Sequence, residues 1–181
     1  MCKGLIMGTA LALALASSFG GIAVAQQATV TQLAQAGEIS AEDQDFLTKA
    51  IQAGVAEVQI SELALEKSQN EQVRQFAERM VQDHTAANER LLSLAETAGN
   101  TPLMELDQEH QAMLQQLSQL SGEEFDRQYM QGQVQDHEAA VRLFASEATQ
   151  PTGPVDALAA ELLPALRQHL QMAEEIRNSL T

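Results

Sequence analysis

Apolar residues recur at steps of three and four along five segments of the chain, which is the spacing of one buried helical face. The segments run from about 40 to 67, 69 to 98, 103 to 120, 122 to 148 and 154 to 180. Ser40 followed by Asp43 marks the first start, and Ser68 with Glu71 and Ser121 with Glu124 have the form of capping boxes. The pattern predicts an all-α protein.

The lengths of the segments predict their arrangement. Four segments of about 25 to 30 residues each make helices about 40 Å long, and the third segment is shorter. Short loops make consecutive helices antiparallel neighbours. The expected fold is therefore a four-helix bundle in which the shorter helix crosses over between the second and third long helices.

Polar residues interrupt the apolar face near the middle of each long segment. His84 follows Val73, Phe76 and Met80 in the same stripe, and Glu57, His137 and His169 hold comparable places in the other three long segments. Antiparallel helices of similar length bring their centres to one level. These four side chains are therefore expected to meet in one layer of the core.

Two interpretations of this layer remain open. Three neutral imidazoles and a carboxylate suit one transition metal ion, Zn, Fe, Mn or Cu. Alternatively, Glu57 and the histidines form a metal-free polar network, with Tyr129 and Asp136 as further hydrogen-bond partners. Asp83 lies about 100° around the helix from its neighbour His84, so the two are not expected to bind one ion.

The remaining residues point to a non-catalytic role. His110 falls near the start of the short helix, where a capping or surface role is expected. Pro164 lies inside the last segment and predicts a kink five residues before His169. The sequence has no nucleophile–base motif, no glycine-rich phosphate loop and no paired-cysteine zinc motif. Whether the protein is an enzyme stays open, with a non-enzyme favoured.

The N-terminus has the form of an export signal. Lys3 precedes an apolar run from Leu5 to Ala16, and 23–25 read Ala-Val-Ala, a small-residue cleavage site. We expect a signal peptide at 1–25, a flexible lead-in at 26–39 and the helical domain at 40–181. The expected location is the periplasm, with outer-membrane association allowed, and no transmembrane segment remains after cleavage.

The charge and the cysteine content limit the classes of partner that the protein is expected to bind. The chain has 25 acidic and 10 basic residues, for a formal net charge of −15. This charge argues against nucleic acid as a partner. Cys2 leaves with the signal, so packing or a ligand must hold the exported domain without disulfides. A metal ion, an unidentified protein and a second copy of the chain remain as partners.

Four stretches resemble one exported bacterial family. They are 53–57, 80–84 with its Asp-His pair, 122–129, and 163–170 with its Leu-Pro and His169. The family is the domain of unknown function 4142, placed among ferritin-like bundles and often labelled as outer-membrane proteins. The resemblance covers about 43 to 180, implies the bundle with its long crossover, and supplies no activity.

The wider ferritin-like di-iron proteins place Glu-x-x-His on two helices. Here Val81, Val134 and Leu166 stand three residues before the histidines, so a single metal is the most that these residues support. The first functional hypothesis is an exported ferritin-like bundle binding one metal ion at Glu57, His84, His137 and His169. The alternative is a non-enzymatic envelope or stress-related interaction protein whose histidines are structural.

Overall fold

The computed structural model describes residues 39–102, 104–149 and 153–180, and these residues form five α-helices and no β-strand. The helices are α2 (Ala41–Lys67), α3 (Glu71–Thr97), α4 (Gln108–Ser118), α5 (Gly122–Glu147) and α6 (Pro154–Ser179). The predicted signal peptide and all but the last residue of the predicted lead-in lie outside the described residues.

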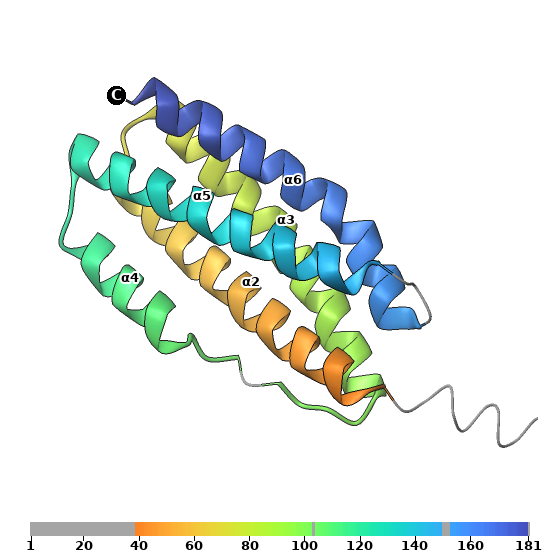
Figure 1. Cartoon of the computed structure of the whole chain (residues 1–181). Helices are drawn as coiled ribbons and strands as arrows, with labels where there is room; N and C mark the ends of the chain where they lie inside the picture. The colour runs from red at the N-terminus through yellow and green to blue at the C-terminus, as the bar shows by residue number, and fades with distance from the viewer. Residues whose placement is uncertain (1–38, 103, 150–152, 181) are drawn as a thin grey trace, which may run out of the picture. The chain divides into compact units, whose positions relative to one another are not determined.

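The four long helices pack as two antiparallel hairpins. Helix α2 packs mainly on α3, and α5 packs mainly on α6, while α2–α5 and α3–α6 contacts join the two pairs. Helix α4 and the segment before it return the chain along the outside of the bundle, so that α5 begins at the end where α3 began (Figure 1). The predicted all-α bundle with a crossover helix is confirmed.

Two predicted helix starts are placed as expected. The Ser40 hydroxyl accepts a hydrogen bond from the Asp43 backbone N–H, and the Asp43 carboxylate accepts one from the Ser40 N–H, both at 3.0 Å. This reciprocal pair is a capping box, and it begins α2 at the predicted start. Pro154 occupies the first position of α6, where its missing N–H costs no helical bond.

The two predicted capping boxes are wrong. Ser68 ends α2, and α3 is capped by Asn70, whose Oδ1 accepts from the backbone N–H groups of Gln72 and Val73. An Asn at the N-cap satisfies the same free amides as a Ser would, so the helix begins two residues later than the box implies. Ser121 precedes α5 but forms no side-chain cap.

The crossover helix is shorter than predicted. Asp107 accepts a hydrogen bond from the His110 N–H at 2.9 Å and caps α4, which has 11 residues and does not begin near Leu103. A carboxylate that satisfies the free amides fixes the helix start at this point. The predicted stop of α3 is confirmed, because Gly99 has φ 75° and precedes a bond from Asn100 N to the Ala95 carbonyl.

The buried residues form two apolar clusters with a polar layer between them. The Phe46 cluster is Phe46, Leu47, Ala50, Ile51, Val55, Leu91, Ala95, Phe144, Val155, Leu158, Ala159, Leu163 and Leu166. The Tyr129 cluster is Ala56, Ile60, Ala64, Val73, Phe76, Ala77, Met80, Leu117, Phe125, Tyr129, Met130, Val134 and Ala173. The polar layer consists of the buried Glu57, His84, Asn88, Gln133, His137 and His169. The fold thus positions a polar layer in the core, as the sequence predicts.

None of the described helices has a stretch both long enough and apolar enough to cross a bilayer.

Candidate metal centre

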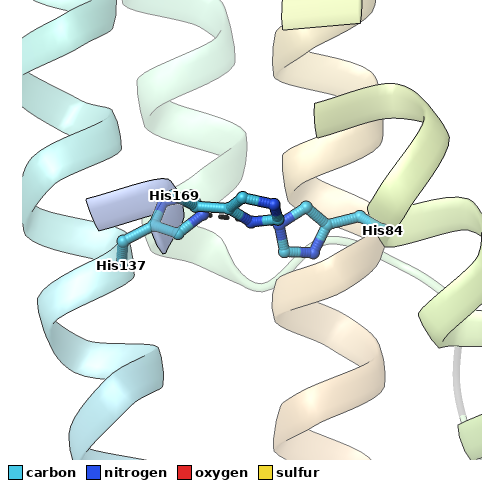
Figure 2. A group of neighbouring side chains, drawn as sticks. All are labelled: His84, His137 and His169. Atoms are coloured by element: carbon cyan, nitrogen blue, oxygen red, sulfur yellow. Dashed lines mark hydrogen bonds between the residues drawn. The ribbon is translucent and has the colours of Figure 1, made fainter. Parts of the chain in front are cut away.

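Three histidines from three helices meet in the polar layer. His84 comes from α3, His137 from α5 and His169 from α6, and each pair of rings has its centroids 5.5 Å apart. One ring nitrogen of each lies within 4.8 Å of one ring nitrogen of the other two. Figure 2 shows the three side chains reaching toward one another from their helices. The structure therefore brings together three of the four predicted site residues.

The spacing of His84 and His137 matches a shared ion. Their Nε2 atoms are 3.4 Å apart, and both side chains are buried. Two imidazole nitrogens bound to one tetrahedral zinc at about 2.1 Å are themselves about 3.4 Å apart. The same distance also allows a weak hydrogen bond between the rings if one Nε2 carries a proton.

The tautomer of His137 is set by its own helix. Its Nδ1 lies 2.9 Å from the backbone carbonyl oxygen of Gln133, one turn earlier in α5. A carbonyl can only accept, so the neutral ring carries its proton on Nδ1 and leaves the Nε2 lone pair toward His84. An acceptor that holds the outer ring N–H in this way is what orients a metal-binding imidazole.

His169 is held by a carboxylate from another helix. Its Nε2 lies 2.9 Å from Oδ2 of Asp83, which also accepts from Arg79 at 3.1 Å. Partial burial raises the pKa of Asp83, but the hydrogen bonds from His169 and Arg79 together lower it by a larger amount. The pKa of Asp83 therefore lies below its usual value. The ionised carboxylate fixes the proton on Nε2, which leaves Nδ1 buried with no partner among the described residues.

Burial keeps the three rings neutral. Desolvation lowers the pKa of His84 well below its usual value, and the neighbouring His137 and His169 lower it further. Desolvation also lowers the pKa of His137 and that of His169, against the opposing bonds to Gln133 and Asp83. Neutral imidazoles have the lone pairs that coordination requires.

The structure places Glu57 outside the histidine group. Its Oε2 accepts a hydrogen bond from Gln133 Nε2 at 2.8 Å, and its Oε1 lies 3.5 Å from His137 Nδ1. It therefore sits behind His137, on the side of the ring away from the facing nitrogens. Burial raises the pKa of Glu57 to about 7, while the Gln133 bond and His110 act in the opposite direction.

The expected network partners are not the observed ones. The Tyr129 hydroxyl lies 2.9 Å from the Ser61 hydroxyl inside its own cluster and makes no contact with the histidine nitrogens in the described part of the chain. Asp136 is half-buried, and burial followed by the charge of Glu57 raises its pKa to about 7. Sequence reasoning missed two polar members of the layer, Gln133, which is a hydrogen-bond partner, and Asn88, whose Oδ1 has no partner among the described residues. The i−4 spacing of Gln133 from His137 and the i+4 spacing of Asn88 from His84 were the available signals.

A cavity of about 650 Å³ adjoins the layer and is lined by all three histidines. Its polar wall includes Glu57, Asn88, Asp107, His110 and Asp136, and its apolar wall includes Leu91, Leu143, Phe144 and Leu166. The volume lies within the range of small-molecule sites, about 300–1,000 Å³. The histidine group therefore borders a space large enough for a small-molecule ligand.

A second group of three potential ligands lies elsewhere. Asp43, Glu147 and Asp156 also place one oxygen each within 4.8 Å of the others, and all three side chains are only half-buried. Burial raises the pKa of Glu147 to about 7, helped by Asp43 and other nearby carboxylates. This acidic group was not predicted from the sequence.

The sequence pattern that defines the domain of unknown function DUF4142 matches residues 28–176. None of the curated proteins compared with the chain matches it. A solved structure, the "Crystal structure of DUF305 fragment from Deinococcus radiodurans", is similar with a TM-score of 0.70 and 19% identity. The match covers 78% of this chain and 99% of that one, and it supports the helical fold alone.

Proposed function

The chain belongs to the family of domain of unknown function DUF4142, and we propose that it binds one transition metal ion through His84, His137 and His169. The observation that carries the proposal is the set of three buried, mutually close ring nitrogens. On His137 and His169 the other ring nitrogen already has an acceptor outside the group. This leaves His169 Nδ1 without a partner among the described residues, and the Nε2 lone pair of His137 facing only His84 Nε2, at 3.4 Å.

The three imidazole ligands limit which metal ion the site can bind. Imidazole nitrogens suit Zn, Cu and Fe, whereas Mn favours carboxylates, carbonyls and water. With Glu57 behind His137, the first-row ions that fit three neutral nitrogens best are Zn and Cu. Gln133 and Asp83 would orient the ligands, and Glu57 would counter the positive charge of the ion from behind His137.

The role that fits this site is cation binding, storage or stabilisation. Three protein ligands leave a tetrahedral ion one open position, which the adjoining cavity would serve. We also propose that the protein acts after export to the periplasm, on the strength of the signal-like residues 1–25 and of a chain whose cysteine lies in that segment.

The direct test is metal content of tag-free protein together with titration by Zn(II) and by Co(II), whose visible spectrum reports tetrahedral nitrogen ligation. Wild-type protein should bind one equivalent. The affinity of His137→Gln for these ions should be about a hundredfold lower, because the variant lacks one of the three ligands. The matched control is His110→Gln, since His110 is the one histidine outside the group, and it should bind as wild type does. Protein that takes up no stoichiometric Zn(II) or Co(II) would refute the proposal.

The second candidate is a metal-free bundle that acts as an envelope interaction protein. The 3.4 Å contact between His84 and His137 favours it, because one Nε2–H can serve both rings without an ion. In that case the variants above would change stability equally with and without chelator, and tag-free protein would contain no metal.

A further inference from the structure

One of the four long helices supplies no ligand to the histidine group. His84, His137 and His169 come from α3, α5 and α6, so α2 is the remaining long helix. Its polar residue at this level, Glu57, is buried and accepts a hydrogen bond from Gln133 behind His137. An ion held by the three rings would therefore keep one tetrahedral position that no described side chain fills.

The cavity adjoins the layer on the side of α2. Ala53 of α2 lines this cavity together with the three histidines, and its short side chain leaves space between α2 and the rings. The Tyr129 cluster contributes no described residue to the lining, whereas the Phe46 cluster contributes several. The cavity therefore extends from the histidines toward the Phe46 cluster, and a ligand in it can lie beside the open position of the ion.

The wall of the cavity at the Phe46 cluster is apolar. Leu91, Phe144 and Leu166 belong to that cluster and line the cavity, and Leu143 packs on the cluster and lines the cavity as well. A ligand with a hydrocarbon portion would remove this surface from water, which is favourable. The ligand that fits the space therefore has an apolar body and a metal-binding donor at one end.

The donor that fits the open position best is a thiolate sulfur. Zn(II) binds thiolate sulfur as well as imidazole nitrogen, and it has no redox chemistry that would oxidise the sulfur. A thiol is mostly neutral in water at pH 7 and is deprotonated when it binds a metal. In this step the S–H bond breaks, a metal–sulfur bond replaces the bond to a bound water molecule, and the proton passes to solvent.

The acidic lining disfavours a ligand that is already an anion in solution. Asp107 and Glu109, at the start of α4, line the cavity of a chain whose formal net charge is −15. The cations at the lining, Lys49 and Arg142, have exposed side chains, and each pairs with a carboxylate one turn earlier in its own helix. A carboxylate ligand would be repelled on its way to the ion, whereas a neutral thiol would not.

We infer that this cavity binds a small apolar thiol, whose sulfur takes the open position of the ion and whose hydrocarbon body lies against Leu91, Phe144 and Leu166. The inference rests on the proposed function, because the ion held by the three histidines forms the bond to sulfur. It deepens that function by assigning a class of ligand to the site. A hydrocarbon body of about four to six carbons suits the volume of the cavity.

The test uses Co(II) in place of Zn(II) and 1-butanethiol as the probe, because sulfur bound to Co(II) adds a charge-transfer band in the near ultraviolet. The tag-free protein carries Cys2→Ser, which removes the one cysteine of the chain, and the samples are kept free of oxygen. One equivalent of 1-butanethiol per ion should saturate the band. The probe 2-mercaptoethanol has the same donor and a polar end, and it should bind about tenfold more weakly.

Pentanoate tests the preference for a thiol. It has the hydrocarbon chain of 1-butanethiol and a carboxylate as the donor, and its affinity is measured by its ability to suppress the sulfur band. We expect pentanoate to bind about tenfold more weakly than 1-butanethiol, because the acidic lining repels it. Pentanoate that binds as tightly as 1-butanethiol would overturn the assignment of a thiol.

The uptake of Co(II), measured before any thiol is added, separates this inference from the proposed function. Protein that takes up no Co(II) would refute the proposed function and this inference with it. Protein that takes up Co(II) but shows no sulfur band would overturn the inference alone. Equal affinities for 1-butanethiol and 2-mercaptoethanol would also overturn it, because the cavity would then contribute nothing to binding.

A matched pair of variants locates the hydrocarbon portion of the ligand. Ala53→Leu fills part of the cavity beside the histidines, so this variant should take up Co(II) but bind 1-butanethiol no more tightly than 2-mercaptoethanol. Ala86→Leu places the same side chain on an exposed part of α3 outside the cavity and should keep the preference for 1-butanethiol. The same preference in both variants would overturn the inference. Circular dichroism checks folding, and the comparison of the three probes needs neither variant.

Discussion

The histidine group and the acidic group of Asp43, Glu147 and Asp156 meet the same distance criterion, with three ligand atoms within 4.8 Å in each. They differ in which lone pairs are already engaged. Asp43 accepts from the Ser40 N–H at the start of α2, and Asp156 accepts from the Gly153 N–H at the start of α6. These carboxylates complete helix starts, where negative charge is favourable.

The histidines have the opposite arrangement. Gln133 and Asp83 engage the outward nitrogens of His137 and His169, so the remaining lone pairs lie in the buried layer. The comparison teaches that proximity of ligand atoms does not define a metal site. A site also needs lone pairs that nothing else in the protein uses, in a place where water cannot satisfy them.

The largest expected effect is metal-dependent stability. Zn(II) or Cu(II) at a hundred times its Kd should stabilise the protein by about 2.7 kcal/mol, which raises Tm by roughly 5–10 °C for a domain of this size. Millimolar Ca(II), which favours oxygen ligands, should produce no shift at the acidic group. The check is thermal melting followed by circular dichroism. A Tm shift with Ca(II) as large as that with Zn(II) would contradict the conclusion that the histidine group is the better metal site.

His84→Leu separates ligand from network. His84 has one hydrogen-bond contact in the described residues, the 3.4 Å contact with His137, so its loss leaves the contact of His137 with Gln133 and that of His169 with Asp83 intact. We expect the free energy of unfolding of chelator-treated protein to change by less than about 1 kcal/mol, since the leucine fills a similar volume with apolar atoms. The metal-dependent stabilisation of about 2.7 kcal/mol should disappear. Urea unfolding with and without Zn(II) measures the stability of the metal-free protein and the stabilisation by metal. An equal loss of stability in the two conditions would contradict the role of His84 as a ligand.

The two groups should respond to pH in opposite directions. The folded pKa of each layer histidine lies below its usual value of 6.5, so the unfolded chain binds more protons in mild acid. Their contribution to stability is present above about pH 6.5 and is lost as pH falls below it. Glu57, Asp136 and Glu147, whose pKa values are raised to about 7, act in the opposite direction, so the histidine contribution is read as the difference between wild type and His84→Leu. Between pH 7.5 and pH 5.5 the urea midpoint of chelator-treated wild-type protein should fall relative to that of His84→Leu, and a constant difference would argue against neutral buried rings.

The smallest effect should come from Glu147→Gln. The folded pKa of Glu147 is raised from 4.5 to about 7, so its ionisation opposes folding as pH rises through that interval. The substitution should stabilise the protein at pH 8, by less than about 1 kcal/mol because the group is partly solvated, and should have no such effect below about pH 4.5. Glu138→Gln, at an exposed 3.8 Å ion pair with Arg142, is the control. A loss of stability at pH 8 would indicate that Glu147 is stabilised as a carboxylate.

The bundle and the histidine layer could be predicted because each depends on periodicity. A polar residue that keeps the three-and-four spacing of an apolar stripe must point inward, which placed His84, His137 and His169 together. Glu57 follows the same rule and is buried, but periodicity sets only the direction of a side chain. Its distance from the ligand nitrogens was set by Gln133, whose amide holds the carboxylate on the far side of His137.

Partners from other helices were beyond sequence reasoning. Asp83 was not expected to share an ion with its neighbour His84, and that geometry does direct it elsewhere, to His169 on α6. The angle between adjacent helices decides which ring receives the carboxylate, and no local pattern encodes it. The prediction of where α4 begins was wrong for a different reason. The sequence allows a helix to begin near Leu103 or after Asp107, and only the cap formed by Asp107 decides between them.

The polar layer also divides the bundle into two separately buried apolar clusters, each drawing residues from all four long helices. Native-state hydrogen exchange resolves such units when one opens while the other stays closed. Amides on either side of His169 in α6 should then exchange with different opening free energies in chelator-treated protein. An ion shared by α3, α5 and α6 would couple the two openings, so the exchange rates in both halves would converge on one global value.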